Sequence, residues 1–166
     1  MRVAVYPGSF DPVTFGHLDV LRRAADVFDR VVIAVLENPR KAPLLAAAER
    51  IELLRAVVGA EAGGIAARVE VAGFDGLTVE FCRTRNARFL VRGLRAVSDF
   101  ETEMLLAHNN RKLAPDVDSV FFMTAIEHGY VSSSLVKEIA SFGGNVAEMV
   151  PEAAVEALGE AFRDRR

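Results

Sequence analysis

The 166-residue chain contains a single cysteine, Cys82, so neither an internal disulfide nor a cluster of thiolate metal ligands can form. This scarcity is typical of a reducing compartment, and we predict a cytoplasmic location. No apolar run approaches the length of a membrane span, and the first residues lack the charged, apolar and small-residue segments of a secretory signal. We therefore expect no membrane partner and no export.

Positive charge is not in excess, because 20 Lys and Arg stand against 23 Asp and Glu, for a formal net charge of −3. General affinity for nucleic acid needs a surplus of cations, so we predict no nucleic-acid partner. Any phosphate chemistry must depend on local positive charge. Hydrophobic residues make up 51% of the chain, enough to build the core of one compact domain over residues 1–166.

Short apolar runs rich in Val, Ile and Phe alternate with longer segments whose apolar residues recur every three or four positions. This alternation is typical of βαβ units and predicts a Rossmann-like, doubly wound α/β fold: a five-stranded parallel sheet with helices on both faces. The predicted strands are Val3–Tyr6, Val31–Leu36, Arg68–Ala72, Arg88–Val91 and Ser119–Thr124.

Helix boundaries are marked by residues that favour helix ends. Ser98 stands three residues before Glu101 and predicts a capping box. Gly143 and Gly144 predict the end of a helix that starts near Leu135, and Pro151 predicts the first position of the last helix.

The turn after the first predicted strand is the first candidate ligand site, since ligands of such sheets bind at the carboxyl ends of strands near the reversal of strand order. It runs from Pro7 to His17 and contains neither a G-x-G-x-x-G pattern nor a P-loop. Gly16 and His17 stand at a helix start, where unpaired N–H groups and the helix dipole stabilise an anion. We predict a phosphate site in which His17 is a directional donor; the alternative is that His17 only caps its own helix.

A second segment, after the fourth predicted strand, places Arg92 and Arg95 around Gly93. The planar guanidinium binds phosphate through two hydrogen bonds, so this segment predicts a second phosphate contact, although a solvated charged loop is the alternative. Glu103, further along, could hold a ribose hydroxyl, an adjacent Arg or a metal-bound water.

A third segment follows the fifth predicted strand and contains three consecutive hydroxyls, Ser132 to Ser134, at a helix start. Such hydroxyls either cap the helix or bind phosphate. Lys137, one turn further on, could reach a phosphate or solvent. Three such turns at one edge of a sheet together favour a triphosphate site.

These segments resemble the bacterial phosphopantetheine adenylyltransferases, members of the nucleotidyltransferase superfamily marked by a T/H-x-G-H signature. The signature is Thr14-Phe15-Gly16-His17, which specifies only the superfamily. The segment Arg92–Glu101, together with the three serines, narrows the resemblance to this family, and the similarity covers essentially the whole chain.

The resemblance implies reversible transfer of AMP from ATP to 4′-phosphopantetheine, giving dephospho-coenzyme A and pyrophosphate, the penultimate step of coenzyme A biosynthesis. The implied catalytic residues are His17, Lys41 and Arg92, and the implied acceptor-binding residues are Ser9, Lys41, Thr78 and Arg92. The implied ATP-binding residues are Ser9, Phe10, His17, Gly93, Leu94, Arg95, Glu103, His128, Gly129, Tyr130, Val131, Ser132, Ser133 and Ser134. Mg2+ would arrive with ATP and need no dedicated protein ligands. A homohexamer, with coenzyme A as a candidate feedback inhibitor, is also implied.

Some positions depart from the family pattern. His128-Gly129 replaces a bulkier aromatic pair and Thr102 replaces an aromatic residue, which leaves adenine stacking and local packing open. A nicotinate mononucleotide adenylyltransferase or a cytidylyltransferase would share the first turn but should differ at Lys41, Arg92 and the serines. A non-catalytic sensor of adenylates is the alternative from another class.

Overall fold

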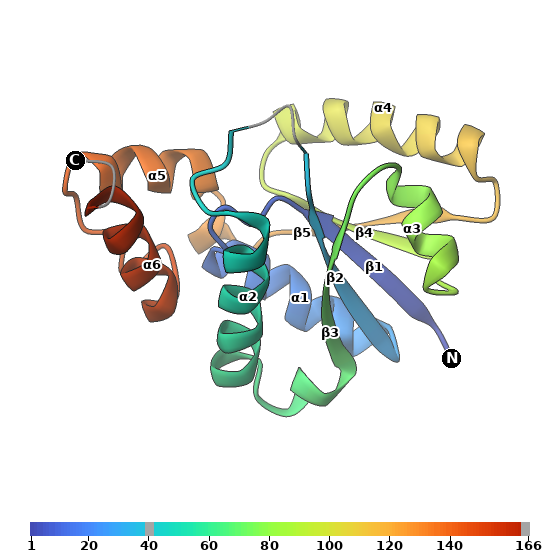
Figure 1. The fold of residues 1–166 in the computed structure, drawn as a ribbon. Coiled ribbons are helices and arrows are strands. Elements are labelled where there is room, and N and C mark those ends of the chain that lie inside the picture. Colours follow the sequence, from blue (N-terminus) through green and yellow to red (C-terminus); the bar gives the residue numbers. More distant parts are fainter. Residues whose placement is uncertain (39–41, 164–166) are drawn as a thin grey trace.

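The computed structural model describes residues 1–38 and 42–163. Within them, five parallel strands form one sheet in the order β3-β2-β1-β4-β5 (Figure 1). The strands are β1 (Val3–Gly8), β2 (Arg30–Leu36), β3 (Val69–Phe74), β4 (Phe89–Leu94) and β5 (Asp118–Met123). The five predicted strands and the parallel arrangement are confirmed, with boundaries that differ by at most three residues.

Helices cover both faces of the sheet, as a doubly wound fold requires. Figure 1 shows α1 (Phe15–Val27) and α2 (Ala47–Glu61) on one side, and α3 (Thr78–Thr84) and α4 (Val97–Leu113) on the other. Side chains alternate along β1, so that Val3 and Val5 pack with Cys82 while Ala4 packs with Leu21. Each face of the sheet therefore has its own apolar core.

The remaining elements are α5 (Ser133–Ser141), α6 (Glu152–Arg163) and two 3-10 helices, η1 (Gly63–Arg68) and η2 (Ile126–His128). The helix stop at the paired glycines is confirmed: Gly143 has φ 79°, and Gly144 N–H donates to Ile139 O at 2.9 Å. In the described parts of the chain, no helix has both the length and the apolar character needed to cross a bilayer.

The capping box predicted at Ser98 is wrong. Helix α4 begins one residue earlier, at Val97, and Ala96 occupies the N-cap position without a side-chain cap. Asp99 instead accepts the backbone N–H of Arg95 at 3.0 Å, which serves the turn that precedes the helix. Ser98 consequently lies inside the first turn, where its hydroxyl cannot act as the cap.

An opening forms where the strand order reverses. β1 pairs with β2 over its whole length, whereas its pairing with β4 is short, with Ala4 opposite Phe89 and Val5 opposite Leu90. Beyond these pairs the carboxyl halves of β1 and β4 are not paired to each other in the described sheet. The reversal thus creates a crevice at the carboxyl edge, the position expected for a ligand in this class of sheet.

Candidate active site

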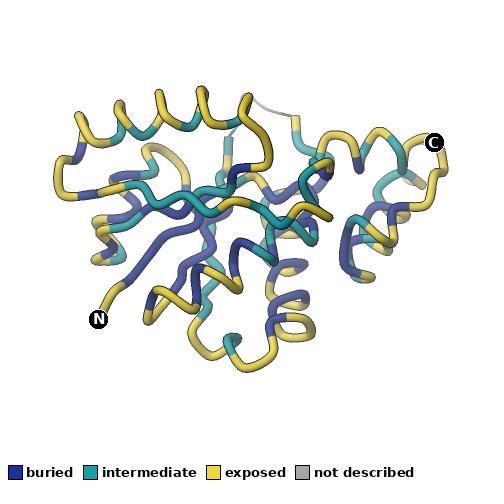
Figure 2. Tube along the Cα trace, turned by 180° about the vertical axis from the view of Figure 1, so that it is seen from behind, coloured by how far each residue is buried: buried dark blue, intermediate teal, exposed yellow. Residues whose placement is uncertain are grey.

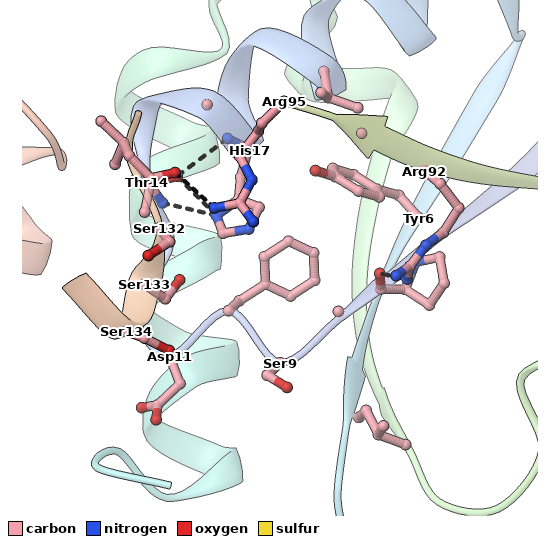
Figure 3. A pocket seen from close by; sticks show the side chains of 18 of the residues that line it. Tyr6, Ser9, Asp11, Thr14, His17, Arg92, Arg95, Ser132, Ser133 and Ser134 are labelled. Carbon is pink, nitrogen blue, oxygen red and sulfur yellow. Dashed lines mark hydrogen bonds between the residues drawn. The ribbon is translucent and has the colours of Figure 1, made fainter. Parts of the chain in front are cut away.

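A cavity of about 650 Å³ lies at this carboxyl edge (Figure 3). The first turn, the end of β4 and the start of α5 all contribute to its wall, so the three sequence segments meet in one place. His17 and Arg95, which are 78 positions apart in the sequence, line the same cavity. The predicted residues in its wall are Ser9, Phe10, His17, Arg92, Gly93, Arg95, Glu103, Val131, Ser132, Ser133 and Ser134.

His17 is held in the first turn of α1 by Thr14. The backbone N–H of Thr14 donates to His17 Nδ1 at 3.0 Å, and the backbone N–H of His17 donates to Thr14 Oγ1 at 3.3 Å. Because Nδ1 accepts this hydrogen bond, the ring proton of the neutral imidazole belongs on Nε2. The two interpretations of His17 are therefore compatible, since one nitrogen caps the helix and the other is a donor.

The environment of His17 keeps the imidazole neutral. Burial lowers the pKa of His17 to about 4, and the positive charges of Arg95 and Arg92 act in the same direction. The ring of Phe10 packs edge-on against His17, with 5.0 Å between the ring centroids. Phe10 adopts a left-handed backbone conformation with φ 47°, a strained geometry that is typical of functional turns. His17 is thus a neutral, oriented hydrogen-bond donor at neutral pH.

Glycine is required beside this turn. A Cβ on Gly8 would lie 3.0 Å from ring atoms of Phe10, so a larger residue there would displace the ring that packs on His17. A Cβ on Gly93 would lie 3.0 Å from Val20 Cγ2, where β4 approaches α1. Both glycines permit a close approach inside the site.

The second site segment is linked to the other two by its arginines, Arg92 in β4 and Arg95 just after it. Arg92 donates from Nε and Nη2 to the two carboxylate oxygens of Glu103, each at 2.6 Å, and from Nη1 to Pro7 O at 3.1 Å. Arg95 binds Asp99 and donates to Val131 O at 3.1 Å. Of the three partners considered for Glu103, the structure therefore shows the adjacent arginine.

The serine segment caps α5 and fixes it to the first turn. Ser132 Oγ accepts the backbone N–H of Leu135 at 3.1 Å, and Ser133 Oγ donates to Pro12 O at 2.7 Å. Ser132 thus caps α5, as the capping alternative predicts, whereas Ser133 binds the first turn. The start of α5 nevertheless lines the cavity, and the positive end of its helix dipole makes this wall suited to an anion.

Five predicted site residues do not line the cavity: Thr78, Leu94, His128, Gly129 and Tyr130. Thr78 begins α3 beyond the end of β3, and Leu94 is buried at the end of β4. His128 stacks on Phe15, with 6.1 Å between the ring centroids and 29° between the ring planes. Lys41 lies outside the described residues.

Three charged residues of the cavity wall were not predicted as site residues: Asp11, Arg50 and Asp99. Arg50 is 3% exposed and belongs to α2, in a segment whose sequence indicates only an amphipathic core helix. Asp11 is 4% exposed and accepts hydrogen bonds from Leu44, Leu45 and Lys137. The sequence signal that could have identified Arg50 is a charged residue at a position of α2 that faces the core.

The fold and the cavity together define the class. A family model described as cytidylyltransferase-like matches residues 5–139. Two solved structures of Plasmodium falciparum nicotinic acid mononucleotide adenylyltransferase, complexed with NaAD and with APC, share the fold with TM-scores of 0.69 and 0.70. They are 13% and 12% identical to this chain, covering 96% of it and 95% and 94% of their own lengths. The chain is thus a nucleotidyltransferase with a Rossmann-like fold.

Curated relatives are more specific. The phosphopantetheine adenylyltransferase of Lachnoclostridium phytofermentans is 48% identical over 100% of this chain and 99% of that protein. Those of Caldanaerobacter subterraneus and Synechococcus are 52% and 49% identical over 98% of this chain and 99% and 95% of theirs. The chain belongs to the phosphopantetheine adenylyltransferase family, which confirms the resemblance seen in its sequence.

Proposed function

We propose that this enzyme transfers AMP from ATP to 4′-phosphopantetheine, reversibly giving dephospho-coenzyme A and pyrophosphate, in the penultimate step of coenzyme A biosynthesis. The observation that carries the proposal is that three segments predicted to bind phosphate line one cavity around a neutral histidine. The curated relatives named for this activity match the chain over nearly its full length. In the proposed reaction, the triphosphate of ATP and the phosphate of the acceptor both have to bind in this cavity.

The chemistry requires no protein nucleophile. An oxygen of the acceptor phosphate attacks the α-phosphorus of ATP, the bond from that phosphorus to the bridging oxygen breaks, and pyrophosphate leaves. The attacking phosphate is already ionised at neutral pH, so no general base has to remove a proton. The protein has to align the two phosphates and stabilise the charge that builds on the α-phosphate, and the Nε2–H of His17 is the donor for that charge.

The predicted site residues, including those that do not line the described cavity, divide between the two ligands in this proposal. Ser9, Lys41, Thr78 and Arg92 serve the acceptor, and Ser9, Phe10, His17, Gly93 to Arg95, Glu103 and His128 to Ser134 serve ATP. Mg2+ enters on the triphosphate. The three carboxylates of the described wall are each paired with a cation, which favours a metal held by phosphate oxygens and water: Asp11 with Lys137, Asp99 with Arg95 and Glu103 with Arg92.

Release of pyrophosphate tests the proposal. The enzyme is incubated with ATP and Mg2+ and with each of a panel of phosphorylated acceptors, including 4′-phosphopantetheine and nicotinate mononucleotide. We expect release with 4′-phosphopantetheine and, in the reverse direction, ATP formation from dephospho-coenzyme A and pyrophosphate. Preference for another acceptor would assign a different transferase. Nucleotide binding without pyrophosphate release for any acceptor would favour the non-catalytic sensor of adenylates. Coenzyme A added to the same assay tests its proposed role as a feedback inhibitor.

Lys41→Ala is expected to raise the KM for 4′-phosphopantetheine about tenfold, as for loss of one charge-assisted contact, while the KM for ATP stays near that of the parent. Lys41 lies outside the described residues, so its role rests on the family resemblance. Steady-state kinetics with each substrate varied in turn measures both constants. Arg55→Ala, at an exposed site on α2, is the control. An effect on the KM for ATP alone would contradict the acceptor assignment.

We also propose that residues 1–166 act as one domain, in the cytoplasm, and assemble as a homohexamer. Helix α4 supports assembly because it has no buried residue along its described length, and Figure 2 shows it exposed. Val97, Leu105 and Leu113 are 82%, 61% and 55% exposed, an apolar surface suited to subunit contact. Sedimentation equilibrium should give six times the 18.1 kDa chain mass. Leu105→Glu should lower that mass, whereas a monomeric parent protein would refute the hexamer.

A further inference from the structure

Tyr6 brings to the cavity wall a hydroxyl that the proposed mechanism does not use. The residue lies in β1, lines the cavity and is only 5% exposed. Among the described residues, no group forms a hydrogen bond with Tyr6 Oη, and no fully buried side-chain oxygen or nitrogen lacks a partner. The Oη atom is therefore not sealed in the core but opens to the cavity. In Figure 3 it points toward the side on which His17 and Arg95 lie.

Ring packing fixes this hydroxyl relative to His17. The ring of Tyr6 packs edge-on against Phe10, with 5.4 Å between the ring centroids, and its centroid lies 6.5 Å from that of His17. Phe10 in turn packs on His17. Tyrosine has only two side-chain torsions, so a ring that is packed in this way leaves its hydroxyl little freedom. The phenol and the imidazole therefore belong to one packed cluster of three rings.

Gly93 leaves space beside the Tyr6 hydroxyl. A Cβ at this position would lie 4.0 Å from Tyr6 Oη and 3.6 Å from Thr124 Oγ1, in van der Waals contact with both. Gly93 and Thr124 also line the cavity. A larger residue at position 93 would fill part of the space beside the phenol, so the glycine keeps the hydroxyl accessible to a ligand.

The Tyr6 hydroxyl keeps its proton. Burial raises the pKa of Tyr6 above its usual value of about 10, and the positive charge of Arg92 opposes that increase only in part. Tyr6 is thus a neutral donor at neutral pH, as His17 is.

The neighbouring groups select the kind of partner that this donor needs. The phenol and the Nε2–H of His17 are both neutral donors in the wall of one cavity, and the charge of Arg92 acts on both rings. A ligand group that only accepts hydrogen bonds can satisfy both donors, and a phosphate does so with several oxygens. A phenol without a partner in a largely apolar setting is costly, and contact with a phosphate oxygen removes that cost.

We propose that Tyr6 is a second neutral hydrogen-bond donor of the site, with its Oη–H donating to a phosphate oxygen of a ligand bound beside His17. The inference rests on the proposed function, from which it takes that the ligands of this cavity carry phosphates. Because the nucleotide and the acceptor both do, the experiment has one arm for each.

Tyr6→Phe removes one oxygen and keeps the ring that packs on Phe10. Calorimetric titration of parent and variant compares AMP with adenosine, and 4′-phosphopantetheine with pantetheine. The proposed mechanism places His17 at the α-phosphate, so we expect Tyr6→Phe to bind AMP about fivefold more weakly, as for loss of one neutral hydrogen bond, and adenosine unchanged. Weaker binding of 4′-phosphopantetheine alone, with pantetheine unchanged, would also support the donor and assign it to the acceptor phosphate.

Two results of these titrations would overturn the inference. One is parental affinity of Tyr6→Phe for both phosphorylated ligands. The other is an equal loss of affinity for each phosphorylated ligand and its counterpart without phosphate. Ser141→Ala is the control, because it removes a hydroxyl from an exposed position on α5 that does not line the described cavity. Its affinities for all four ligands should match those of the parent.

Urea unfolding separates ligand binding from a structural role. Since no described residue bonds the hydroxyl, we expect Tyr6→Phe to be at least as stable as the parent while it binds phosphate more weakly. A Tyr6→Phe protein that is less stable than the parent, or that does not fold, would assign the hydroxyl to the fold and overturn the inference.

The titrations need no transfer, so the inference and the proposed function fail separately. A parent protein that binds AMP but releases no pyrophosphate with any acceptor would refute the transfer reaction, while weaker AMP binding by Tyr6→Phe would still support Tyr6. A parent protein that catalyses transfer, with a Tyr6→Phe variant that binds both phosphorylated ligands as tightly as the parent, would refute Tyr6 alone. Absence of both binding and turnover in the parent would overturn both.

Discussion

Replacement of His17 by alanine is expected to lower the turnover number about hundredfold or more, as for loss of a transition-state donor. Thr14 binds Nδ1 and thereby orients the ring, so no free energy is needed during the reaction to position the Nε2–H. In the proposed mechanism the donor acts on charge that develops on the α-phosphate, so the KM for ATP should stay near the parental value. Initial rates of pyrophosphate release, with ATP and acceptor varied separately, measure both effects.

The control is Glu156→Ala, because Glu156 is exposed on α6 and does not line the described cavity. Its turnover number should match that of the parent. His17→Ala also removes the hydrogen bond from Thr14, so about 1 kcal/mol of stability should be lost and folding must be checked by circular dichroism. A folded His17→Ala protein with parental turnover would remove His17 from the mechanism. A raised KM for ATP at parental turnover would make it a ground-state contact.

The predictable part of the fold depends on local patterns. Unbroken apolar runs such as Val31–Leu36 indicated buried parallel strands because both faces of such strands are covered. The three site segments were predictable because each follows a predicted strand, and the carboxyl ends of parallel strands share one edge of the sheet. Element ends were less predictable: Ser98 resembles a cap in sequence, yet Asp99 binds the preceding turn and the helix starts at Val97.

The unpredictable part of the site depends on contacts between distant residues. Asp11 pairs with Lys137 across 126 positions, and Arg50 reaches Ser9 across 41. No local spacing encodes such partners, so Glu103 likewise kept three candidate partners until the structure placed it against Arg92. The pKa of His17 shows the same limit, because its decrease to about 4 arises from burial and from two distant arginines, Arg92 in β4 and Arg95 just after it.

Asp11→Asn is expected to lower the free energy of unfolding at neutral pH by about 3 kcal/mol, the range for breaking a buried ion pair. The carboxylate accepts Leu44 N–H and Leu45 N–H, each at 2.9 Å, and Lys137 Nζ at 2.7 Å. An amide cannot accept all three, and Lys137, whose side chain is only 28% exposed, would lose its anionic partner. Urea unfolding at a fixed protein concentration measures the change.

The pH dependence gives this prediction a second signature. Burial alone would raise the pKa of Asp11, but the hydrogen bonds from Lys137 and the two backbone amides outweigh it and hold the pKa below its usual range. A folded-state pKa below the unfolded value of about 3.9 stabilises the protein above that pH, and the contribution is lost as the pH falls through the folded value. The stability difference between parent and Asp11→Asn should therefore be constant near neutrality and shrink below about pH 4.

Asp116→Asn is the matched control, because Asp116 pairs with Arg83 at 3.0 Å on the surface, where both side chains are more than 40% exposed. Its loss should leave the free energy of unfolding close to that of the parent. Equal destabilisation by the two substitutions would show that the Asp11 pair behaves as a surface pair. Parental stability of Asp11→Asn, or a difference that grows on acidification, would contradict the view that Asp11 holds the first turn, the approach to α2 and α5 together beside the cavity.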